Sequence, residues 1–97
     1  MIEKEKIIKR AINTYGKKMQ ITVAMEELSE LIKELSKHLR GEHNKEHIIE
    51  EIADVEIMIS QLKIILNIKD IEIDNEILFK LNRLRCRLEG KENDDGD

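Results

Sequence analysis

Apolar residues recur every three or four positions along most of the chain, which is the spacing of one face of an α-helix. The pattern predicts a first helix from about Ile2 to Tyr15, ended by Gly16. A second helix is expected to begin between Lys17 and Thr22 and to end at Gly41. Its apolar stripe consists of Ile21, Ala24, Met25, Leu28, Leu31, Ile32, Leu35 and Leu39.

A third helix follows a polar connector, and Asn44 is suited to be its N-cap. Its apolar residues alternate steps of four and three up to an expected end near Asn67, a heptad-like seam suited to packing against another helix. The seam residues are Ile48, Ile52, Val55, Ile59, Leu62 and Leu66.

The segment 68–74 alternates apolar and polar residues, as a short strand would. A lone strand would have no partner in an otherwise helical chain, so we expect a loop or turn there. Asp74 is then predicted to cap a fourth helix that ends at Gly90. The inward-facing residues of this helix would be Ile77, Leu78, Leu81, Leu84 and Leu88.

The pattern therefore predicts an all-α chain, with one four-helix bundle domain over residues 1–90 and a disordered acidic tail over residues 91–97. A chain of 97 residues has room for a single small domain, and its core must be aliphatic because aromatic residues make up only 2%. Thin bundles of this length often complete their core by association. We therefore expect a homodimer or a homotetramer.

Charge and targeting signals exclude several classes of protein. The net charge of −4 argues against a general affinity for extended nucleic acid or anionic membranes. We expect no membrane span, because no apolar run approaches the roughly 20 residues that a bilayer requires. The start of the chain lacks an apolar signal region, and Cys86 has no second cysteine to pair with. These features favour a cytoplasmic location.

Two groups of acidic residues occupy the second and third predicted helices. In each group, carboxylates three residues apart project together, because they differ by about 60° around the helix axis. The pairs are Glu27 with Glu30, and Glu51 with Asp54. Each pair flanks an apolar stripe, so an antiparallel packing of the two helices would bring all four carboxylates into one small space.

Such a cluster would repel itself unless protons or cations offset its charge. Hard oxygen ligands from two helices suit Mg²⁺, with Mn²⁺ as an alternative. The competing interpretation is a solvated charged face, which is common in a chain that is 39% charged. The scarcity of basic neighbours argues against a solvated face. Lys33 is the single basic residue between Met25 and Leu35, and residues 48–62 contain none.

The two motifs together resemble the signature of the MazG-like all-α nucleoside triphosphate pyrophosphohydrolases. They read Glu26-Glu27-x-x-Glu30, then twenty residues, then Glu51-x-x-Asp54. The resemblance covers roughly residues 20–88 and is nearest to the compact single-domain versions found in phages and bacteria. Val-Glu-Ile-Met follows Asp54, where phosphoribosyl-ATP pyrophosphohydrolases usually carry a histidine, which points away from histidine biosynthesis.

This resemblance implies Mg²⁺ held by Glu27, Glu30, Glu51 and Asp54, with Glu26 as an accessory acid. It also implies hydrolysis of a nucleoside triphosphate to the monophosphate and pyrophosphate, for removal of unwanted nucleotides. Lys80 and Arg83 resemble the basic residues that family members place in the corresponding late helix to bind phosphates, although they could equally be surface charges. The alternative function is a non-catalytic helical oligomerisation or adaptor protein.

Overall fold

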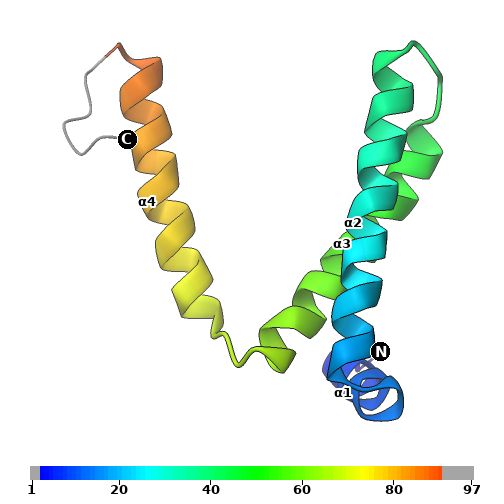
Figure 1. The fold of residues 1–97 in the computed structure, drawn as a ribbon. Coiled ribbons are helices and arrows are strands. Elements are labelled where there is room, and N and C mark those ends of the chain that lie inside the picture. The colour runs from blue at the N-terminus through cyan, green and yellow to red at the C-terminus, as the bar shows by residue number, and fades with distance from the viewer. Residues whose placement is uncertain (1–2, 91–97) are drawn as a thin grey trace. The chain divides into compact units, whose positions relative to one another are not determined.

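The computed structural model describes residues 3–90 and consists of four α-helices (Figure 1). They are α1 (Lys4–Tyr15), α2 (Lys17–Leu39), α3 (Lys45–Ile65) and α4 (Asp70–Leu88). The prediction of an all-α chain is therefore confirmed. Among the described helices, none is both long and apolar enough to cross a membrane. The predicted disordered tail lies outside the described residues.

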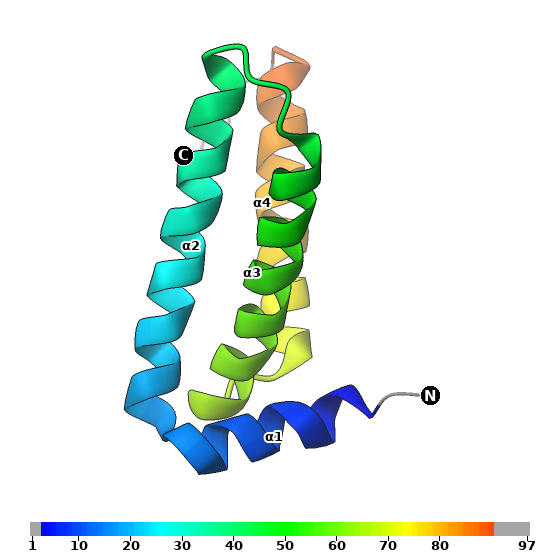
Figure 2. The same cartoon turned by 90° about the vertical axis from the view of Figure 1, so that its right-hand side faces the viewer.

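The chain divides into two units, one that ends at Asn67 and one that begins at Ile68. In the first unit, α2 and α3 lie side by side as an antiparallel hairpin (Figure 2). Helix α1 runs across the end of the hairpin opposite the connector and contacts both helices. Its Ile8 and Ile12 are buried there. The second unit contains α4, and a single domain over residues 1–90 stays a prediction.

Glycines separate the first three helices as predicted. Gly16 joins α1 directly to α2 with a φ of 93°, and Gly41 follows α2 with a φ of 94°. These left-handed backbone angles are strained for residues that carry a Cβ atom, so each helix ends where a glycine permits the change of direction. The connector from Gly41 to Asn44 is short enough to return α3 along α2.

The interface between α2 and α3 includes buried polar residues. Helix α2 buries Gln20, Ala24 and Glu34. Helix α3 buries Val55, Met58 and Gln61. The Gln20 Nε2 atom donates a buried hydrogen bond of 2.8 Å to Gln61 Oε1 at the end of the hairpin near α1. This bond offsets the desolvation of two amides and fixes which residues of the two helices face each other.

The predicted packing of the apolar stripes against one another is wrong. Most of the α2 stripe is exposed, including Ile32 at 68% and Leu39 at 86%. On α3, Val55 is buried whereas Ile52 and Ile59 are exposed. The helices instead meet along the neighbouring flank, which lies about 100° around each axis from the centre of the stripe.

Both exposed stripes lie on the same side of the hairpin. Each is displaced from the contact line by about 100° in the same rotational sense along its own chain. Because α2 and α3 run antiparallel, equal displacements bring the stripes to one common side. The exposed apolar residues of the two helices therefore lie on one side of the hairpin. Its exposed members are Met25, Leu28, Ile32, Leu35, Leu39, Ile52, Ile59 and Leu66.

The predicted loop over residues 68–74 is wrong from Asp70 onward, because α4 begins there. Lys69 is the N-cap in place of Asp74, and its backbone N–H donates to Glu72 Oε2 at 2.9 Å. The apparent alternation concealed a helical pair, Ile73 and Ile77, at a spacing of four. The second unit contains no other described helix against which the apolar face of α4 could pack, so the prediction that this face points inward stays a prediction.

The Gln20–Gln61 bond yields a stability prediction. Replacement of Gln20 by alanine leaves the buried Gln61 amide without its partner and should lower the free energy of unfolding by about 1–3 kcal/mol. Replacement of both residues by leucine should cost less than either single alanine variant. Urea denaturation measures these differences, with the exposed Thr22→Ala as control. Equal stability of wild type and Gln20→Ala would contradict this role for the bond.

Candidate metal centre

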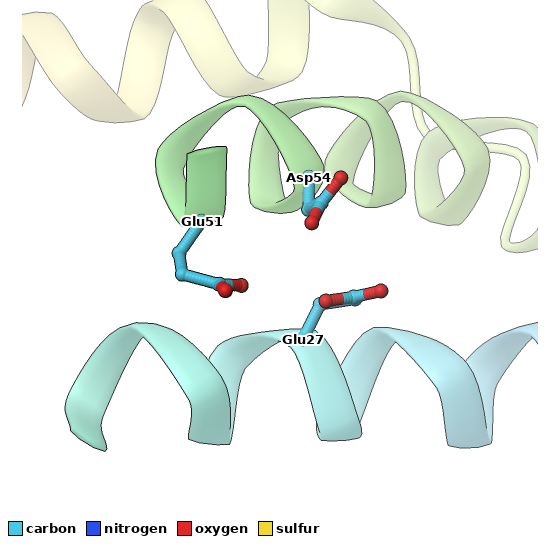
Figure 3. A group of neighbouring side chains, drawn as sticks. All are labelled: Glu27, Glu51 and Asp54. Atoms are coloured by element: carbon cyan, nitrogen blue, oxygen red, sulfur yellow. The ribbon is translucent and has the colours of Figure 1, made fainter. Parts of the chain in front are cut away.

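Three of the predicted carboxylates converge between α2 and α3. Glu27 comes from α2, and Glu51 and Asp54 come from α3, and their side chains point toward one another (Figure 3). One carboxylate oxygen from each residue lies within 4.8 Å of those of the other two. Oxygen atoms at such separations can all contact a single small cation, whose bonds to oxygen are about 2.0–2.6 Å long.

The helical register explains why these acids point inward. On α2, positions 20, 24, 27, 31 and 34 follow steps of four and three and form the line that faces α3. Glu27 is therefore the middle residue of the contact line, between Ala24 and Leu31. On α3, Glu51 and Asp54 lie beside the buried Val55 and Met58. The antiparallel pairing that joins Gln20 to Gln61 thus places Glu27 level with Asp54.

The pKa values of two of these carboxyl groups are raised. For Glu27, removal from water has the largest effect, followed by the negative charges of Asp54, Glu51 and Glu30. For Glu51, removal from water again comes first, followed by Asp54 and Glu30. Both side chains are half-buried. The cluster therefore attracts positive charge, which a proton or a metal ion can supply.

One oxygen of the cluster has no hydrogen-bond partner. Glu51 Oε1 is buried and accepts no hydrogen bond from any residue in the described part of the chain. A buried carboxylate oxygen without a donor is unfavourable, because it loses its water and gains nothing in exchange. A hard cation bound between Glu27, Glu51 and Asp54 would satisfy this oxygen, so the donor set fits such an ion.

Glu34 lies next along the same line but has a different role. Its Oε1 accepts a hydrogen bond of 2.7 Å from Asn44 Nδ2, and Lys37 Nζ lies 3.4 Å from its Oε2. The Asn44 bond, with help from Lys37, lowers the pKa of Glu34 although burial opposes this. The same Nδ2 atom also donates to the Glu34 carbonyl oxygen at 2.9 Å. Protein groups therefore stabilise the ionised form of Glu34, which ties the connector to α2.

The structure changes the predicted role of Asn44. This residue is the N-cap of α3 by position, but its side chain makes no capping hydrogen bond and is buried against Glu34 instead. Sequence reasoning did not identify this contact. The signal that could have found it is the spacing of seven between Glu27 and Glu34, which puts both on one helix face, with Glu34 at the end of that face nearer the connector.

The other predicted acids lie at the margin of the cluster. Glu30 is exposed, and its Oε1 is 3.8 Å from Lys33 Nζ on the same helix. Its charge nevertheless reaches Glu27 and Glu51, since it contributes to raising both pKa values. Glu26 is exposed as well. The structure thus brings together three of the four predicted ligands and leaves Glu30 beside them.

The predicted phosphate-binding residues lie on α4, in the second unit of the chain. Lys80 is exposed, and Arg83 is half-buried with its guanidinium carbon 5.6 Å from the centre of the Phe79 ring. This distance is typical of a cation–π contact. A role of these residues in phosphate binding stays a prediction.

The raised pKa of Glu51 has a consequence for stability. The folded chain binds this proton more tightly than the unfolded chain, so the free energy of unfolding should fall as the pH rises from 4.5 through the raised pKa. Replacement of Glu51 by glutamine, which does not ionise, removes this fall in the free energy of unfolding. Glu51→Gln should therefore unfold at a higher temperature than wild type near pH 8 in the presence of a chelator, and by a smaller margin near pH 4.

Thermal denaturation across this pH range measures the effect, with Glu56→Gln as a matched control. Glu56 is an exposed acid on the same helix, outside the cluster, and its variant should follow the wild type. A Glu51→Gln variant less stable than wild type near pH 8 would show that the ionised Glu51 carboxylate does not destabilise the folded chain.

Comparison with known proteins gives no relative from which a function could be transferred. No family model, no curated protein and no solved structure matches this chain.

Proposed function

We propose that this protein is a Mg²⁺-dependent nucleoside triphosphate pyrophosphohydrolase, which cleaves a triphosphate to the monophosphate and pyrophosphate. The observation that carries the proposal is the convergence of Glu27, Glu51 and Asp54 from two helices. These are residues of the two motifs that resemble the MazG-like signature. The house-cleaning of nucleotide pools in the cytoplasm is the cellular role that this resemblance suggests.

The chemistry of the donors favours Mg²⁺, or Mn²⁺, over softer metals. All three convergent side chains offer carboxylate oxygen, and neither histidine nor cysteine belongs to the group within the described residues. Mg²⁺ commonly uses few protein carboxylates and completes its shell with water and substrate phosphate oxygens. When bound, it would offset phosphate charge and lower the pKa of a coordinated water.

The protein side chains would divide the remaining work. Glu27, Glu51 and Asp54 would hold the cation, and Glu30 would add negative charge at the margin of the site. Glu27 or Glu30 would accept a proton from the attacking water, as a carboxylate within reach of that water can. Lys80 and Arg83 would bind phosphate oxygens through charge-assisted hydrogen bonds.

A second candidate function is a non-catalytic oligomerisation or adaptor protein. The apolar side of the α2–α3 hairpin favours it, because large residues such as Ile32 and Leu39 are exposed there. The two candidates differ in what the acids do. An adaptor would keep its interactions when the carboxylates are neutralised, whereas the enzyme would lose its metal and its activity.

The first test is catalytic. Wild-type protein should release pyrophosphate from at least one member of a panel of nucleoside and deoxynucleoside triphosphates when Mg²⁺ is present. Glu51→Gln and Asp54→Asn should each reduce kcat/KM by at least about a hundredfold, because each removes a ligand charge. The control Glu56→Gln should retain activity. Absence of turnover on the whole panel would refute the enzymatic proposal.

The second test measures the cation without a substrate. Mg²⁺ or Mn²⁺ at millimolar concentration should raise the melting temperature of wild-type protein, since binding to the folded state alone stabilises it. Glu27→Gln should abolish this rise, and Glu56→Gln should preserve it. A wild-type melting temperature that does not respond to either cation would remove the basis for metal binding.

A further inference from the structure

Helix α4 carries an apolar stripe of its own. Its residues follow steps of four, four, three and four, which keep them within about 80° of the position of Leu81. Four of the five are exposed, from Leu84 at 42% to Leu88 at 78%. An amphipathic helix gains most of its stability by burial of this face, and the described part of the second unit contains no other helix that could cover it. The stripe consists of Ile73, Ile77, Leu81, Leu84 and Leu88.

The charges of α4 are segregated along its length. Residues 70–76 contain four acids and no base, and residues 80–87 contain four bases and no acid. Acids near the N-terminus and bases near the C-terminus stabilise a helix through its dipole, but that effect acts within the first and last turns. The segregation of α4 continues into the middle of the helix. The charged residues are Asp70, Glu72, Asp74, Glu76, Lys80, Arg83, Arg85 and Arg87.

Such a helix is complementary to an antiparallel copy of itself. If Ile73 of one copy lies level with Leu84 of the other, each acidic half lies beside a basic half. In the same arrangement Asp70 is level with Arg87, and Asp74 is two residues from the level of Arg85. A parallel arrangement would instead place acids beside acids and bases beside bases.

The flanks of the stripe match as well. Asp74 and Arg85 lie about 20° and 40° from Leu81 in the same rotational sense. In an antiparallel pair, such positions come to the same side of the interface. Arg85 donates to Asn82 Oδ1 at 2.6 Å, but its guanidinium carries five N–H donors and can bond a carboxylate at the same time.

We propose that α4 is a self-association element, which pairs antiparallel with α4 of a second copy of this chain about a two-fold axis near residues 78 and 79. The interface is isologous, so each of its contacts occurs twice. The proposal does not depend on the enzymatic function proposed above.

The apolar stripe of α4 could also pack on the apolar side of the α2–α3 hairpin. The charge pattern favours α4 of a second copy as the partner. That hairpin contains four acids and one base over residues 26–34, and four acids and no base over residues 50–56. The basic half of a docked α4 would meet opposite charge there, but its acidic half would meet further acids. A second α4 supplies opposite charge along the whole helix and buries an apolar stripe at the same time.

The oligomeric state of the full chain tests the proposal. Light scattering and sedimentation should show a concentration-dependent dimer or an even-numbered assembly of dimers. Asp74→Arg and Arg85→Asp should each raise the dissociation constant about tenfold at low salt, because each places like charges together twice in the interface. The double variant Asp74→Arg/Arg85→Asp should return to within about threefold of wild type.

Asn75→Arg is the control, since it adds positive charge on the side of the helix opposite the stripe, about 160° from the centre of the stripe. It should change the dissociation constant by less than about twofold. A wild-type chain that is monomeric at all concentrations would overturn the proposal. So would an assembly that responds to Asn75→Arg and not to Asp74→Arg.

Cross-linking tests the direction of the helices. With Cys86→Ser as background, Leu78→Cys should be joined efficiently to its own counterpart by a short bis-maleimide, because residue 78 lies beside the two-fold axis. Leu88→Cys should not react in this way, since its counterparts are separated by about 28 Å along the axis. Efficient cross-linking through residue 88 would indicate a parallel pair, and no cross-linking through residue 78 would indicate another interface. Either result would overturn the antiparallel arrangement.

Discussion

The polar line between α2 and α3 determines the arrangement of the first unit. It begins with the Gln20–Gln61 hydrogen bond near α1 and ends with the bonds of Asn44 to Glu34 at the connector. Each bond costs more to break than a comparable surface contact, because the groups it satisfies are buried. These hydrogen bonds fix both ends of the line, so the two helices face each other along it. Glu27 lies on this line and therefore faces α3.

This constraint creates the candidate metal centre. Glu27 and Glu51 are held half out of water beside other negative charges, and this raises their pKa values. Glu34 lies on the same line, but Asn44 and Lys37 satisfy its oxygens and its pKa is lowered. Two kinds of carboxylate thus occupy one interface. One kind is stabilised in its ionised form by the protein, and the other is left in need of a cation.

The same constraint explains why so much apolar surface is exposed. Because the helices meet along their polar flank, the apolar stripes of α2 and α3 turn to a common side of the hairpin. A single chain therefore buries few large residues, such as Ile8, Ile12, Val55 and Met58. Association of copies through these surfaces would supply the missing burial, and the charge pattern of α4 makes that helix the best defined of them.

The sequence by itself determined the number of helices, most of their ends and the acids that meet. Helical periodicity, Gly16 and Gly41 act locally, so they can be read without a structure, and the spacing of Glu51 and Asp54 fixes their common face. The prediction of a loop over residues 68–74 was wrong, because alternation of apolar and polar residues over a few positions fits both a turn and the start of a helix. Only the tertiary structure decided that the polar flank of α2, rather than its apolar stripe, faces α3. Periodicity shows which residues share a face, but the neighbour of that face is chosen by long-range contacts such as Gln20 with Gln61 and Glu34 with Asn44.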